Sequence, residues 1–173
     1  MSNLRLINET EVSSAVRTVE ITDVFSADFD IYKIVGVTNF TGEEYIDMRL
    51  INLSGSVVSA SNYDNAGLLM KSDAAYDENR NTNVTKAQYL SYAGDVVAEA
   101  GSFVTWIFNP YSTSSYTFLL SQGGAKRTAN TLTTKAISVL KQTSSITGFQ
   151  LYPNTSNVDN ASIRTYGLRV DNG

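Results

Sequence analysis

Glu44-Tyr-Ile-Asp-Met-Arg-Leu-Ile51 is the stretch that indicates the fold most clearly, because its residues alternate with a period of two. Ile46, Met48 and Leu50 fall on one face, and more polar residues such as Arg49 fall on the other. Successive side chains of a β-strand point to opposite faces of its sheet. The stretch therefore predicts a strand with one side in a hydrophobic core.

Two other stretches are apolar on both faces. They are Ile31–Thr38 and Phe103–Phe108, and the second is ended by Asn109-Pro110, since proline cannot donate to a strand ladder. A strand with two apolar faces is expected in the centre of a sheet, with its outer side covered by something else. Trp106 lies in the middle of the second stretch and is expected in the core, with its indole N–H bonded to a backbone acceptor.

Further β-branched and aromatic runs recur along the chain, separated by Gly, Asn, Asp and Ser. They predict strands at Val16–Ile21, Val57–Ser59, Tyr89–Ala93, Tyr116–Gln122, Ala136–Leu140, Ile146–Tyr152 and Ile163–Val170. Helix is expected to be minor, at most a short turn over Tyr63–Met70. Asp73–Asn83 is interpreted as a solvated loop, and Gly123–Arg127 as a basic turn. So many strands without a repeating period predict two packed antiparallel sheets, an all-β sandwich, rather than a propeller or solenoid.

Composition predicts one domain and limits its partners. The 173 residues contain no linker and no block of charge, so we expect an N-terminal arm over residues 1–14 and a single sandwich over residues 15–173. A net charge of −4 gives no basic surface for nucleic acid or anionic membranes. No apolar run is long enough to span a membrane, and the start lacks the pattern of a signal peptide. The expected product is made in a cytoplasm.

Cysteine and histidine are both absent. Their absence removes the Cys and His nucleophile–base pairs, the Ser-His-Asp arrangement and the usual zinc ligands. Paired carboxylates remain, and candidates for glycoside hydrolysis are Asp28, Asp30, Glu43, Glu44 and Asp47. Sequence gives no measure of the carboxylate separation that this mechanism requires. We expect no catalytic residues, no cofactor and no metal, and therefore a protein that is not an enzyme.

Two segments are candidates for partner contacts. Tyr111 and Tyr116 flank a Ser/Thr loop, where exposed rings can stack on a sugar or pack on a neighbouring subunit. Leu4, Leu6 and Ile7 are hydrophobic residues ahead of the first predicted strand. A free tail that carries them would fray, so the segment pairs along a sheet edge of its own domain or of another chain. Both alternatives stay open for each segment.

The two ends of the chain resemble a known family. Ser145–Pro153 (SITGFQLYP), a polar break and Ala161–Val170 (ASIRTYGLRV) resemble the closing strand pair of a family of tailed-phage virion proteins, which stand alone or occur at fibre ends. Thr22–Phe25, Asp28–Asp30 and Tyr32–Val35 are similar to that family's opening, in which an Asp/Phe turn feeds a strand that begins with Tyr. The resemblance spans residues 19–170 and implies a jelly-roll form of the sandwich.

The function expected from this resemblance is a non-enzymatic structural component of a tailed-phage virion. Capsid decoration on the particle surface is favoured over a tail-fibre role, because the chain has no heptads or shaft repeats with which to extend a fibre. The expected partners are copies of the same chain and other virion proteins, such as the major capsid protein or a tail or neck protein. The rival function is receptor contact through a surface that binds host glycans.

Overall fold

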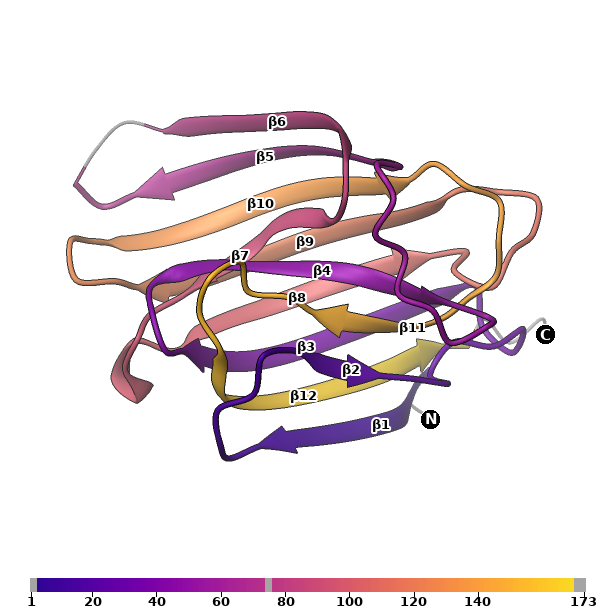
Figure 1. Ribbon diagram of the computed structural model, residues 1–173, viewed down its shortest axis with the longest axis horizontal. Helices are drawn as coiled ribbons and strands as arrows, with labels where there is room; N and C mark the ends of the chain where they lie inside the picture. The colour runs from indigo at the N-terminus through magenta and orange to yellow at the C-terminus, as the bar shows by residue number, and fades with distance from the viewer. Residues whose placement is uncertain (1–2, 74–75, 170–173) are drawn as a thin grey trace.

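The computed structural model describes residues 3–73 and 76–169, and it is a sandwich of two antiparallel β-sheets (Figure 1). The large sheet has eight strands, in the order β1 (Leu4–Val12), β12 (Val158–Leu168), β3 (Ile31–Phe40), β8 (Gly101–Phe108), β9 (Thr117–Lys126), β10 (Thr131–Leu140), β5 (Tyr63–Lys71) and β6 (Asp77–Val84). The small sheet has four, in the order β2 (Val19–Ile21), β11 (Ile146–Leu151), β4 (Glu44–Asn52) and β7 (Ala87–Ala93). One short 3-10 helix, η1 (Val97–Glu99), is found in the described residues.

The chain passes repeatedly from one sheet to the other. Of the eleven connections between consecutive strands, three stay in the large sheet, at β5–β6, β8–β9 and β9–β10. The other eight cross between sheets, which is the alternation of a jelly-roll-like sandwich. The predicted fold class, an all-β antiparallel sandwich with minor helix, is therefore confirmed.

The core lies between the two sheets and contains tyrosines whose hydroxyl groups are satisfied. Tyr63 is fully buried, and its hydroxyl accepts from the Leu50 N–H at 3.0 Å and donates to the Val58 carbonyl at 3.1 Å. Tyr32 is also fully buried, and its hydroxyl bonds both backbone groups of Ser26. Buried phenols need such partners, because an unpaired buried hydroxyl costs about 1–3 kcal/mol. The two tyrosines tie loops to the sheets from inside.

Close approach of the two central strands requires a glycine. Gly36 on β3 lies opposite Phe103 on β8, and a Cβ atom added to Gly36 would stand 2.4 Å from the Phe103 ring. The Phe103 side chain is 2% exposed, so the ring has no room to withdraw. Glycine at this position lets the ring lie flat over β3.

Several local predictions are wrong. Tyr63–Met70 is not a turn of helix but most of β5, whose inward residues include Tyr63 and Leu69. It resembled a helix because both of its faces carry apolar side chains. Most of the loop predicted over residues 73–83 is edge strand β6, and positions 74 and 75 lie outside the described residues. Gly123 and Gly124 continue β9 instead of forming a turn.

The N-terminal segment is a strand of the large sheet rather than a free arm. β1 pairs antiparallel with β12 from Leu4 opposite Leu168 to Val12 opposite Ala161, with a bulge between Leu6 and Asn8. Of the two alternatives left open by the sequence, the structure therefore has pairing on the chain's own sheet edge. The boundary placed at residue 14 does not separate an arm from the sandwich.

Candidate functional site: the outer face of the large sheet

The large sheet has a second surface, its outer face, which points away from the small sheet and is uncovered by the described chain. Strand register places its outward side chains in four rows. Row 1 is Leu4, Leu168, Ile31, Phe108, Phe118, Val139 and Asp64; row 2 is Leu6, Tyr166, Lys33, Trp106, Leu120, Ile137, Ala66 and Arg80. Row 3 is Glu9, Arg164, Val35, Val104, Gln122, Lys135, Leu68 and Glu78; row 4 is Glu11, Ser162, Val37, Ser102, Gly124, Thr133 and Met70.

Rows 1 and 2 are almost entirely hydrophobic and open to solvent. Leu120 and Phe118 are each 41% exposed, Ile137 is 48% exposed and Leu6 is 49% exposed. Antiparallel sheets commonly pair one buried face with one polar, solvated face. Here half of the solvated face, rows 1 and 2, is apolar instead, and contiguous exposed apolar patches mark interaction sites.

The expectation that β3 and β8 are covered on both sides is therefore wrong for this chain taken alone. Both strands do lie in the middle of the large sheet, with β3 between β12 and β8. Their inner residues, such as Ile34 and Ile107, are fully buried. Their outer residues are not, since Val37 is 49% exposed. The small sheet packs on the inner face only (Figure 1).

Trp106 lies on the outer face and not in the core, which corrects the prediction. It is half-buried, and its cross-strand neighbours are Lys33 on β3 and Leu120 on β9. The Lys33 ammonium lies 5.4 Å from the centroid of the indole ring, within cation–π range. The odd-numbered residues of β8 point inward, so Phe103 and Ile107 occupy the core position that the sequence analysis gave to Trp106.

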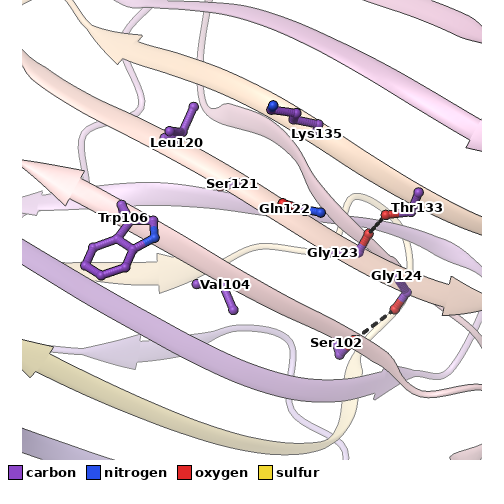
Figure 2. Close-up of a pocket in the computed structure, with 10 residues that line it drawn as sticks. All are labelled: Ser102, Val104, Trp106, Leu120, Ser121, Gln122, Gly123, Gly124, Thr133 and Lys135. Carbon is purple, nitrogen blue, oxygen red and sulfur yellow. Dashed lines mark hydrogen bonds between the residues drawn. The ribbon is translucent and has the colours of Figure 1, made fainter.

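A shallow hollow of about 630 Å³ opens beside Trp106 on this face (Figure 2). Its floor is made of small residues, and two of their hydroxyls are already used. Thr133 Oγ1 donates to the Gly123 carbonyl at 2.5 Å, and Ser102 Oγ donates to the Gly124 carbonyl at 3.3 Å. Lys135 also lines the hollow and makes no hydrogen bond or ion pair with the described residues.

The five residues predicted to contact partners are not brought together. Leu6 is on the outer face, and Leu4 lies at the end of row 1, whereas Ile7 packs against the core. Tyr116 precedes β9 and is 45% exposed. Tyr111 lies earlier in the same loop between β8 and β9, where it is half-buried and its carbonyl accepts a hydrogen bond from the Ser145 hydroxyl. Only part of the predicted set therefore belongs to the outer face.

The aromatic cluster found in the structure is elsewhere. Tyr45 lies edge-on to both Tyr89 and Tyr92, with ring centroids 5.1 Å and 5.2 Å apart. Burial is the main reason that the phenol pKa of each of the three is raised. These rings pack edge to face on one another, so part of each ring is already covered by its neighbour.

Four of the five candidate catalytic carboxylates make structural contacts, and for Asp30 the contact is through its backbone carbonyl, which accepts from the Asn109 N–H at 2.7 Å. Glu43 accepts from the Thr128 N–H at 2.5 Å, and this bond is the main reason that the Glu43 pKa is lowered. Glu44 accepts from the backbone N–H groups of Thr155 and Ser156. Burial raises the Glu44 pKa, but these hydrogen bonds outweigh it and hold the pKa below its usual value. Asp28 bonds Ser26 within its own turn.

Asp47 forms the buried ion pair of the small sheet. Its carboxylate lies 2.7 Å from Lys86 Nζ and accepts from the Tyr89 N–H at 3.0 Å. Both side chains are at least nine-tenths buried. Burial raises the Asp47 pKa to about 6, and the attraction of Lys86 only partly opposes that rise. The pair ties β4 to the start of β7.

One acidic group was not anticipated from the sequence. Glu43, Asp95 and Glu99 place carboxylate oxygens within 4.8 Å of one another at the end of the sandwich that holds η1. Lys126 Nζ lies 3.6 Å from Glu99, so part of the negative charge is already balanced. Asp95 and Glu99 are four residues apart, but Glu43 is distant in sequence, and no local spacing signals that it joins them.

Comparisons with protein-family models, with curated proteins and with solved structures find no match to this chain. Within residues 3–73 and 76–169, no helix is long and apolar enough to cross a membrane.

Proposed function

We propose that this chain is a non-enzymatic structural component of a tailed-phage virion, and within that class a capsid decoration protein on the particle surface. It is made in the cytoplasm of the host bacterium and works by association with other virion proteins. The observation that carries the proposal is the apolar outer face. A sandwich with a complete core that still exposes Phe118, Leu120 and Ile137 together is built to associate.

The sequence resemblance supports the virion context of the proposal. The Asp/Phe turn that resembles the family's opening is the one in which Phe25 and Phe29 pack edge-on against Tyr32. The closing pair that resembles the family becomes β11 and β12, one in each sheet. The resembling segments are thus integral parts of both layers.

Binding to particles that lack this protein is the test of the proposal. Purified protein is mixed with such particles and sedimented, and we expect it to bind to a fixed maximum number per particle. Particles that already carry their native copies are the control, and they should bind no more. A density map of the loaded particles then locates the chain on capsid lattice points. Density confined to the neck or tail, or no binding to depleted particles, contradicts capsid decoration.

The second candidate function is receptor contact through a glycan-binding surface. The hollow beside Trp106 favours it, because a half-exposed indole offers a face for a sugar ring and Lys135 offers a cation that has no partner among residues 3–73 and 76–169. Its test is the fluorescence of Trp106, the only Trp in the chain, during titration with host surface oligosaccharides. A saturable change in emission supports this function, and an unchanged spectrum rejects it.

A further inference from the structure

We propose that a second copy of this chain covers the outer face, so that two eight-stranded sheets pack against each other. The inference rests on the proposed function, because it names the partner of the same face.

The first argument is area. Eight strands about 4.8 Å apart span roughly 34 Å, and strands of eight residues at about 3.3 Å each run roughly 27 Å, so the face covers about 900 Å². A standard specific interface buries about 800 Å² on each partner, whereas the largest apolar patch on a typical monomer is about 300–600 Å². The whole outer face therefore has the area of one side of a standard interface, and its apolar half, rows 1 and 2, covers about 450 Å², within the range of the largest apolar patch on a typical monomer.

The second argument is the arrangement of apolar residues. Row 1 has six hydrophobic residues out of seven and row 2 has six out of eight, counting Tyr166. Side chains from two apolar sheet faces interdigitate when the sheets lie about 10 Å apart, as in the core of any sandwich. Rows 1 and 2 resemble the inner face in being mostly hydrophobic, and the inner face already packs in this way.

The third argument is charge. The four rows contain four acids, Glu9, Glu11, Asp64 and Glu78, and four bases, Lys33, Arg80, Lys135 and Arg164, so their net charge is zero. The chain as a whole carries −4. Two copies would repel through most other surfaces, but not through this one. A strongly basic or acidic partner gains nothing here, whereas an identical face is matched in both polarity and charge.

The position of the charges fits a face that is buried at its centre. Three of the acids lie on β1 and β6, the two margins of the sheet. Arg164 bonds Glu9 at 2.5 Å, so this base is already paired at one margin. The apolar centre around Leu120 and Ile137 is then bounded at both margins by polar groups, as in known interfaces. Lys33 and Lys135 lie on the inner strands β3 and β10, and their long side chains can carry the ammonium groups toward water.

Sedimentation equilibrium across a range of protein concentrations tests the pairing directly. We expect wild-type protein to approach twice the chain mass of 18.9 kDa. Ile137→Lys and Leu120→Lys place a charge at the centre of the face and should remain monomeric, while their half-exposed positions leave the fold intact. The matched control is Leu53→Lys, at a 64% exposed loop position after β4, and it should associate like the wild type.

A measurement on the unaltered protein keeps the proposal testable if the lysine variants misfold. Trp106 should become harder to quench with acrylamide as the protein concentration rises, because the second copy covers it. A quenching constant independent of concentration, or a wild type that stays monomeric throughout, overturns the pairing. Lysine variants that fold and still associate overturn it as well, since the contact then uses another surface.

The outcomes separate this inference from the proposed function. A monomeric wild type that binds depleted particles overturns the inference alone. A paired wild type that does not bind them overturns the proposed function alone. A monomer whose Trp106 emission responds to oligosaccharides overturns the pairing and assigns the outer face to glycan binding.

Discussion

Replacing Trp106 with alanine tests which face of β8 is packed inside the sandwich, because Phe103 on the same strand points the opposite way. Trp106 has two cross-strand neighbours, Lys33 and Leu120, and each such pair contributes roughly 0.2–1 kcal/mol. The cation–π contact with Lys33 adds about 0.5 kcal/mol at an exposed site. Trp106→Ala should therefore lower the free energy of unfolding of the monomer by about 1–2 kcal/mol.

Phe103→Ala is the matched comparison. The Phe103 ring is 2% exposed and lies against Gly36, so its removal leaves a closed cavity. Deletion of a large buried aromatic side chain costs about 3–5 kcal/mol. The two variants differ in position by three residues on one strand, and the structure predicts that Phe103→Ala costs at least about 1 kcal/mol more than Trp106→Ala.

The assay is urea unfolding followed by far-ultraviolet circular dichroism, since Trp106 itself is lost in one variant. It is run at low protein concentration and repeated in the Ile137→Lys background, where pairing is expected to be absent, so that association does not add to the measured stability. If Trp106→Ala costs as much as Phe103→Ala in that background, the indole is packed inside and the assignment of the two faces is wrong.

Three further predictions concern the edge, the buried ion pair and the glycines. Deleting residues 1–12 removes β1 and bares the edge of β12, so the melting temperature should fall sharply; an unchanged value would mean that β1 is not part of the fold. Burial raises the Asp47 pKa from 3.8 to about 6, so protonated Asp47 stabilises the folded state. This contribution to the free energy of unfolding is fully present below about pH 4 and is lost as the pH rises through about 6. That pKa shift corresponds to about 3 kcal/mol, at about 1.4 kcal/mol per pH unit. Chemical denaturation from pH 4 to 7 should therefore show the wild type losing stability relative to Asp47→Asn. If the free energies of unfolding of the two proteins change with pH in parallel, the pKa shift is wrong. Gly36→Ala should destabilise by clashing with Phe103, whereas Gly124→Ala, whose nearest neighbour is 3.7 Å away, should be tolerated; equal denaturation midpoints would refute the close approach.

The period of two was sufficient to predict strands wherever only one face is apolar. In β4 the residues assigned to the core, Ile46, Met48 and Leu50, are all fully buried. The alternation was less informative for Asp47, which is 2% exposed although it shares a face with Arg49. Burial of Asp47 depends on Lys86, a residue distant in the chain, and no local pattern records that pairing.

Strands that are apolar on both faces were the main source of error. In β8 the pattern does not say whether Phe103 or Trp106 points inward, and the larger ring was the natural choice for a core. Phe103 points inward instead, and its ring fits against Gly36 on the neighbouring strand. The sequence alone does not show that Gly36 lies opposite this position, because the register of the two strands is not known from it. The same ambiguity made β5 resemble a helix.

The same strands, apolar on both sides, form the exposed outer face. The sequence predicts that a strand such as β3, with Ile34 on one side and Val35 and Val37 on the other, is covered twice. The chain supplies one cover, the small sheet, and its described residues leave the other side open. A second copy of the chain would cover this side without another kind of protein, since its own outer face is equally large, carries no net charge and has the same two apolar rows. Apolar residues on both sides of β8, which led to the wrong prediction that Trp106 is in the core, are thus what a pair of sandwiches packed face to face requires.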